Sequence, residues 1–190
     1  MRYFFIVLLL ICSSCIQIGS DPKPLHYYLL EAPTNQPQIY SSKKLNISIE
    51  LIKFPEYLDR LQIVTNDQKN SVILNENQRW ANPLSDNILQ VLRENLVLAL
   101  PDSIVTIHPW EDADTPATKL KLSVDKFAGK PGETANVAIR WNIIDAEGES
   151  LYGTFSEQQP VAENFSDLVA GLNDSLNRFS QSIAKQLANQ

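Results

Sequence analysis

Both cysteines of this chain, Cys12 and Cys15, lie within its first fifteen residues. No later position supplies a thiol, so the domain that follows has to fold without a disulfide and without a cysteine metal ligand. Hydrophobic packing and hydrogen bonds must therefore provide its stability. The 176 residues from Cys15 to Gln190 are enough for a single domain with a substantial core.

The segment before Cys15 has the composition of an export signal. A positive start is followed by an apolar run over residues 3–11, which is far shorter than the ~20 apolar residues of a membrane-spanning helix. Two serines then precede Cys15, as in signals cut by the lipoprotein signal peptidase. We therefore predict a signal peptide over residues 1–14 and a diacylglycerol on the sulfur of Cys15. An ordinary cleaved signal or a plain hydrophobic N-terminus is the alternative, and the bulky Ile11 disfavours modification of Cys12.

Lipidation of Cys15 would hold the protein on a membrane surface. One acyl chain binds a bilayer only reversibly, whereas several chains on one cysteine give a lasting anchor. Residues 15–24 are rich in glycine, serine and proline, which disfavour regular structure. We expect this segment to be a tether with a reach of at most ~3.3 Å per residue, which keeps a single domain of residues 25–190 close to the bilayer.

The charge of the chain argues against two classes of partner. It has 16 basic and 22 acidic side chains, and loss of Arg2 with the signal lowers the formal net charge from −6 to −7. Nucleic acid requires clustered Lys and Arg, so no nucleic-acid partner is expected. Binding to anionic lipid headgroups through a generally basic surface is disfavoured for the same reason.

Alternating apolar and polar residues predict a sheet with one dry face and one wet face. The pattern is clearest over residues 45–51, where leucine and isoleucine alternate with polar side chains. Further strands are predicted over residues 25–32, 61–65, 71–74, 104–108, 119–125, 137–143 and 150–157.

Two helices are predicted. The first runs from Asn82, as the capping residue, and Pro83 to Leu100, with apolar residues on more than one face. These faces indicate either deep burial or contact with another subunit. The second covers residues 165–187 and has a narrow apolar seam, which packs either on the sheet or in a coiled coil between subunits. The fold class is therefore α+β, a mostly antiparallel sheet of about eight strands with two helices packed on one face.

Little in the sequence indicates catalysis. The chain has only two histidines, His26 and His108, and neither lies in a recognisable motif. The acidic run of Glu111, Asp112 and Asp114 lacks the glycine and glutamate spacing of an EF-hand calcium loop. We expect no enzyme activity, no metal site and no cofactor other than the covalent lipid.

Several strings resemble a known family when they are taken in order. They are HYYLL at residues 26–30, FPEYLDRLQIVTND at 54–67, NQRWANPLSDNILQVLRENL at 77–96 and a W-x-x-x-D pattern at 141–145. Together they resemble the PqiC (paraquat-inducible protein C) lipoproteins, the ABC-type transport auxiliary lipoprotein component. Leu61 and Asn66 depart from the family pattern, which has proline and arginine at these positions.

The resemblance implies an accessory role in transport. It implies a lipoprotein on the periplasmic face of the outer membrane that docks onto an MCE-domain protein, which forms a periplasm-spanning tunnel for lipids. Ile16 after the modified cysteine is compatible with release to the outer membrane. The alternatives are a lipoprotein that binds a lipid or another apolar ligand by itself, in a cavity between helices and sheet, and an assembly scaffold for another outer-membrane protein.

Five residues of the family-like strings are candidates for partner binding: Tyr57, Asp59, Arg60, Arg79 and Trp80. Aromatic and arginine side chains are common interface anchors, so this group is a candidate docking surface for the tunnel protein or a neighbouring copy. In the structural alternative, Asp59 and Arg60 fix a turn and Trp80 fills the join between sheet and helix. A homo-oligomeric ring is expected from the geometry of meeting a symmetric tunnel.

Overall fold

The computed structural model describes residues 23–41, 44–67, 70–109 and 118–189. Cys15 and the acidic residues Glu111, Asp112 and Asp114 lie outside these ranges. The elements in chain order are β1 (His26–Tyr28), β2 (Asn46–Lys53), the 3-10 helix η1 (Glu56–Leu58), β3 (Gln62–Asn66), β4 (Val72–Trp80), α2 (Leu84–Ala99), β5 (Ile104–Ile107), β6 (Thr118–Gly129), β7 (Thr134–Ile144), β8 (Ser150–Pro160) and α3 (Phe165–Ala188).

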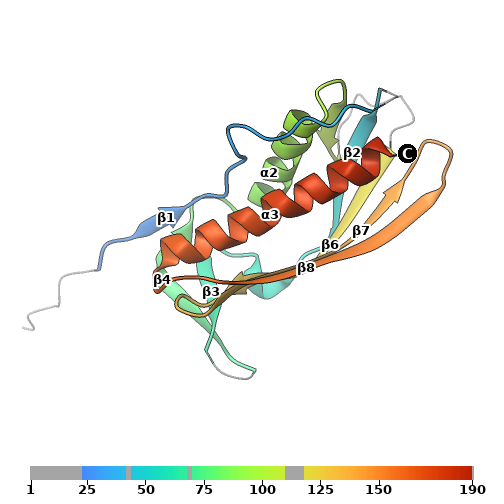
Figure 1. The fold of residues 1–190 in the computed structure, drawn as a ribbon. Helices are drawn as coiled ribbons and strands as arrows, with labels where there is room; N and C mark the ends of the chain where they lie inside the picture. The colour runs from blue at the N-terminus through green and yellow to red at the C-terminus, as the bar shows by residue number, and fades with distance from the viewer. Residues whose placement is uncertain (1–22, 42–43, 68–69, 110–117, 190) are drawn as a thin grey trace, which may run out of the picture.

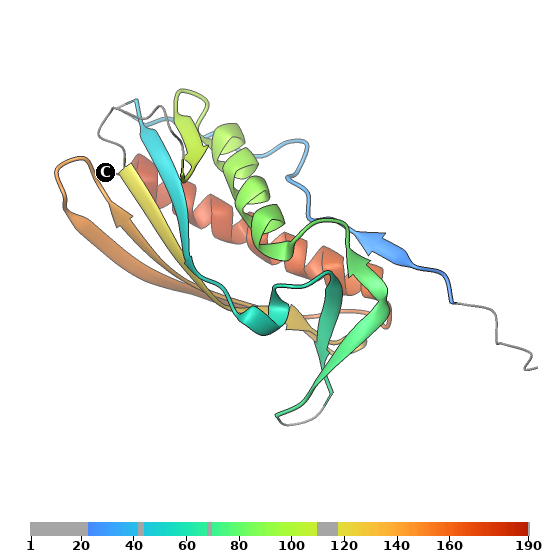
Figure 2. The same ribbon diagram turned by 180° about the vertical axis from the view of Figure 1, so that it is seen from behind.

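The described strands form one eight-stranded mixed sheet, and α2 and α3 both cover the same face of it (Figures 1 and 2). This arrangement confirms the α+β prediction. The longest pairings, β6 with β7 and β7 with β8, are antiparallel. Strand β2 lies parallel to both β5 and β6. The connection from β2 to β5 passes through β3, β4 and α2, which gives the length that a parallel neighbour requires.

A second group of strands continues the sheet at the far end of β6. Strands β3 and β4 form the antiparallel hairpin predicted from the two short apolar runs. Thr65 of β3 pairs in parallel with Gly129 of β6, and β1 adds to β4 in parallel. The first described strand, β1, is therefore a neighbour of the hairpin.

Strand alternation places the core between sheet and helices. Ile47 and Ile49 of β2 are fully buried, as are Leu120 of β6 and Ile143 of β7. Ser48 and Glu50 on the opposite face of β2 are only half-buried. The face without helices is therefore the wet face that the alternation predicts.

Helix α3 places its predicted seam inside the domain. Leu168, Leu172, Leu176, Phe179, Ile183 and Leu187 have at most 1% of their surface exposed. The helix packs on β7 and β8 and against α2, and Phe179 meets Phe155 with ring centroids 5.4 Å apart. Packing on the sheet is confirmed, and the seam has no free face left for a coiled coil.

Helix α2 differs from its prediction at its start. Pro83, not Asn82, is the capping residue, and its side chain makes no capping hydrogen bond. Asn82 lies one residue too early, since Pro83 still has extended backbone angles (φ −50°, ψ 130°). The main apolar stripe is buried, whereas Val97 and Leu98 remain 40% and 38% exposed. Contact of this second face with another subunit stays a prediction.

Candidate docking site

The fold brings the five predicted docking residues together. Tyr57 lies in η1, and Asp59 and Arg60 follow it directly before β3. Arg79, near the end of β4, pairs in register with Gln62 at the start of β3. The N–H of Trp80 donates a hydrogen bond to the carbonyl oxygen of Leu61 over 2.7 Å.

Two of the five residues have structural roles. Trp80 is 3% exposed and belongs to the core. It therefore packs beneath the exposed residues of the site and has almost no surface that a partner could contact. Asp59 accepts a hydrogen bond of 3.2 Å from the Ser85 hydroxyl in the first turn of α2. It thereby ties η1 to the helix. For these two residues the structure favours the structural alternative.

Tyr57, Arg60 and Arg79 form the accessible part, which we call the docking surface. Tyr57 is 41% exposed. Arg79 donates to the carbonyl oxygen of Glu76 over 2.8 Å and forms an ion pair of 3.2 Å with the Glu76 carboxylate. The half-buried Arg60 has an Nε donor without an acceptor among the residues that the structure describes. An aromatic ring and two cations on adjoining segments of the fold suit contact with a protein.

Sequence reasoning missed a second exposed group, the hairpin patch of Val72, Ile73 and Leu74. These residues are 46%, 43% and 39% exposed, although they are consecutive and so lie on both faces of β4. Figure 2 shows the β3–β4 hairpin projecting away from the rest of the sheet. A short apolar run beside a polar turn is typical of an ordinary buried strand. The sequence of this run therefore does not indicate that the hairpin projects from the sheet and exposes it.

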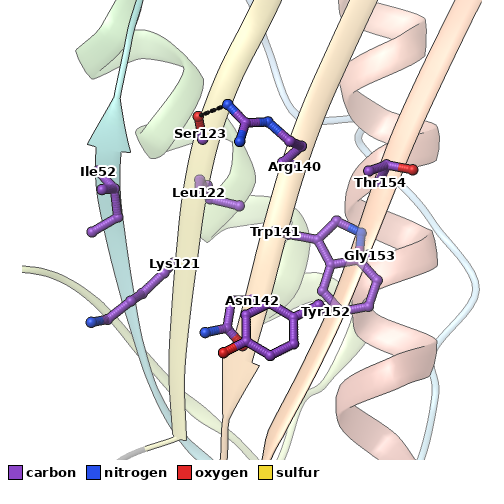
Figure 3. Close-up of a pocket in the computed structure, with 10 residues that line it drawn as sticks. All are labelled: Ile52, Lys121, Leu122, Ser123, Arg140, Trp141, Asn142, Tyr152, Gly153 and Thr154. Atoms are coloured by element: carbon purple, nitrogen blue, oxygen red, sulfur yellow. Dashed lines mark hydrogen bonds between the residues drawn. The ribbon is translucent and has the colours of Figure 1, made fainter.

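A hollow of about 500 Å³ lies on the face of the sheet without helices (Figure 3). It is lined by residues of β2, β6, β7 and β8, among them Ile52, Arg140 and Tyr152. The alternative of a lipid-binding protein placed a cavity between helices and sheet. This hollow lies on the opposite face and is open to solvent.

The family-like W-x-x-x-D pattern has a structural explanation beside this hollow. Trp141 pairs in register with Gly153, and its indole occupies the space where any larger side chain of residue 153 would begin. Asp145 accepts a hydrogen bond of 2.7 Å from the backbone N–H of Glu149 and stabilises the β7–β8 turn. Both motif residues therefore support the long β7–β8 hairpin.

Within the described ranges, no group of three or more His, Cys, Asp or Glu side chains is placed to bind a metal. His26 and His108 are both exposed.

No described helix has the length and apolar character needed to cross a membrane. On the wet face, Arg140 donates two hydrogen bonds of 2.7 Å to the Asp125 carboxylate. These bonds hold the pKa of Asp125 below its ordinary value, against a smaller opposing effect of desolvation.

Comparisons with solved structures reproduce this fold. A crystal structure of an uncharacterized protein matches with a TM-score of 0.72 and 19% identity over 87% of this chain and 99% of the other. A protein from Xanthomonas campestris matches with a TM-score of 0.70 and 12% identity over 86% and 94% of the two chains. The PelC dodecamer from Paraburkholderia phytofirmans reaches a TM-score of only 0.43 at 10% identity, over 78% and 93%, which carries no argument about this chain.

Among curated proteins, no sequence matches this chain. Its sequence does match the family described as "ABC-type transport auxiliary lipoprotein component" over residues 27–184. The match includes all of the docking surface and extends from β1 into α3. The chain belongs to the family of ABC-type transport auxiliary lipoprotein components.

Proposed function

We propose that this protein is a lipid-anchored periplasmic lipoprotein of the outer membrane that docks onto an MCE-domain tunnel protein and assists lipid transport between membranes. The diacylglycerol on Cys15 provides the anchor, and the protein performs no reaction of its own. The observation that carries the proposal is the docking surface of Tyr57, Arg60 and Arg79, which lies within the family match and is held in place by buried neighbours.

Physical chemistry supports protein binding at this surface. Interface energy is concentrated in a few aromatic and arginine side chains that rest on a rigid base. Trp80 and the Asp59–Ser85 hydrogen bond supply that base here. The hairpin patch adds an apolar surface at the other end of β4. An acidic surface on the tunnel protein would complement Arg60 and Arg79.

A cyclic homo-oligomer is part of the proposal. Within the described part of the chain, β8 pairs only with β7, so one edge of this eleven-residue strand is unpaired. Unprotected edges are templates for pairing with another chain. The exposed Val97 and Leu98 of α2 offer a further subunit contact. Native mass spectrometry of the acylated protein in mild detergent measures the subunit number, and a monomer at micromolar concentration would contradict this part of the proposal.

The central test is binding to the MCE-domain protein. A mild-detergent pulldown with mass spectrometry identifies it, and the affinity is then measured for the wild type and for Tyr57→Ala/Arg79→Ala. We expect a loss of at least about thirtyfold, since interface anchors of this type contribute about 2 kcal/mol or more. The matched control is Tyr152→Ala/Arg140→Ala, which removes the same side-chain types from the wet face and should bind as the wild type does.

Equal weakening by both double variants would contradict the assignment of the docking surface. Capture of a β-barrel protein in place of an MCE-domain protein would favour the assembly scaffold. Lipid that co-purifies with a monomer would favour the stand-alone binding protein, with the hollow beside Tyr152 as its site.

A further inference from the structure

The segment that joins the tether to the sheet exposes a regular apolar stripe. Leu25, Tyr27 and Leu29 are 49%, 58% and 45% exposed. They occupy alternate positions of an extended segment, so their side chains lie on one side of it. Leu30 turns to the other side and is 2% exposed. Single exposed leucines are normal in proteins, but a contiguous stripe of three large apolar side chains requires an explanation.

Hydrogen bonds on both sides fix this stripe in its exposed position. Tyr27 pairs in register with Arg79, and the hydroxyl of Tyr28 donates to the Gln78 amide oxygen over 2.6 Å. The side chain of Asn87 in α2 binds both the N–H and the carbonyl oxygen of Leu30, over 2.8 and 3.1 Å. The segment therefore cannot rotate to bury the stripe without breaking these bonds.

The position of the stripe in the chain indicates what covers it. Cys15 precedes Leu25 by ten residues, so the two are at most about 36 Å apart even in a fully extended chain. Acyl chains on Cys15 would keep the stripe within reach of the bilayer at all times. Leucine suits the acyl boundary, and tyrosine suits the interface because its ring is apolar and its hydroxyl is polar. The net charge of −7 leaves apolar contact as the means of attraction.

We propose that Leu25, Tyr27 and Leu29 insert into the interfacial layer of the bilayer as a second membrane contact beside the acyl anchor. This inference rests on the proposed function only through the lipid on Cys15. A lipid anchor alone lets a domain rotate freely, whereas a second contact sets its orientation. Since Tyr27 pairs with Arg79, this end of the docking surface would be held at the level of the lipid headgroups.

The absence of cysteine after Cys15 allows a direct test. Tyr27→Cys and the matched control Tyr152→Cys, which replaces a tyrosine that is 72% exposed on the wet face, are each labelled with an environment-sensitive fluorophore. The acylated proteins are placed in phosphatidylcholine vesicles with or without brominated acyl chains. We expect brominated lipid to quench the probe at residue 27 and to leave the probe at residue 152 unchanged. Circular dichroism checks that both variants fold.

The outcomes separate the inference from the proposed function. Protein that floats with the vesicles while the residue 27 probe is no more quenched than the control overturns the inference and leaves the anchor intact. If the protein does not float with the vesicles, the lipid anchor is refuted, and the inference, which depends on that anchor, is refuted too. A blue shift of the residue 27 probe on addition of unlabelled protein without lipid would assign the stripe to a second copy and would also overturn the inference.

Discussion

Replacement of Gly153 by alanine should destabilise the long β7–β8 hairpin. A Cβ atom at residue 153 would lie 2.2 Å from Cζ2 and 2.5 Å from Cε2 of Trp141. Ordinary contacts between carbon atoms are about 3.5–4.0 Å, so the indole has to move by more than about 1 Å. Overpacking of this kind costs about 1–3 kcal/mol. It outweighs the gain of about 0.5–1 kcal/mol that alanine normally has over glycine in a strand. We expect a net loss of about 1–2 kcal/mol.

Urea unfolding followed by far-ultraviolet circular dichroism measures this loss, which should lower the midpoint by about 0.5–1 M for an m-value of about 2 kcal/mol/M. The control is a double-mutant cycle with Trp141→Leu, which removes the ring that causes the clash. In that background Gly153→Ala should be neutral or slightly stabilising, which gives a coupling energy of about 1–2 kcal/mol. Additive losses in the two backgrounds would refute the reasoning, because the cost would then not arise at Trp141.

Three further predictions concern polar groups. Asn95→Ala should lower the free energy of unfolding by about 1–3 kcal/mol, because it removes the buried amide of α2 that donates to Asn177 and Ser180 of α3. Urea unfolding measures this loss, and an unchanged midpoint would contradict the role of Asn95. Arg140→Gln should raise the pKa of Asp125 toward its ordinary value, as NMR titration of the carboxyl carbon would show. In the wild type this pair stabilises the fold above the ordinary carboxyl pKa, and the contribution is lost as the pH falls through the lower folded-state value. Asn164→Ala should cost about 1 kcal/mol, since its side chain accepts a hydrogen bond of 2.8 Å from the Asp167 N–H at the start of α3. Asn164→Ser, whose hydroxyl can accept that bond and also donate to the Asp167 carboxylate, should retain most of the stability.

Local pattern was sufficient for most of the fold. Each predicted strand and helix exists, because alternation and the 3.6-residue period report directly which side chains are buried. Several bounds were wrong: the strand predicted over residues 25–32 covers only His26–Tyr28, and the one predicted over 71–74 continues in β4 to Trp80. The α3 seam is the clearest example, since its leucines are fully buried on the sheet. The parallel pairings of β2 were not predicted, because strand order depends on where the crossovers lead and not on the composition of a strand.

The sequence predicted which residues belong to the candidate site, but not which of them are exposed for binding and which are buried for structural support. The family-like strings contain Tyr57, Arg60 and Arg79, and β3–β4 pairing then brings Arg79 beside the start of β3, directly after Arg60 and Leu61. Trp80 has the same signature of an interface anchor, yet it is buried. A tryptophan can serve either purpose, and only its neighbours decide which. Exposure of the hairpin patch is equally invisible in a run of three apolar residues.

By itself, the sequence determined what depends on neighbours along the chain: an acidic charge, the absence of cysteine after residue 15, and the period of each strand and helix. Only the tertiary structure decided which apolar side chains remain outside. Burial depends on contacts between distant segments, as where Asn87 of α2 holds Leu30 and thereby fixes Leu25, Tyr27 and Leu29 toward solvent. The surfaces that a membrane or a partner can meet are set by those long-range contacts.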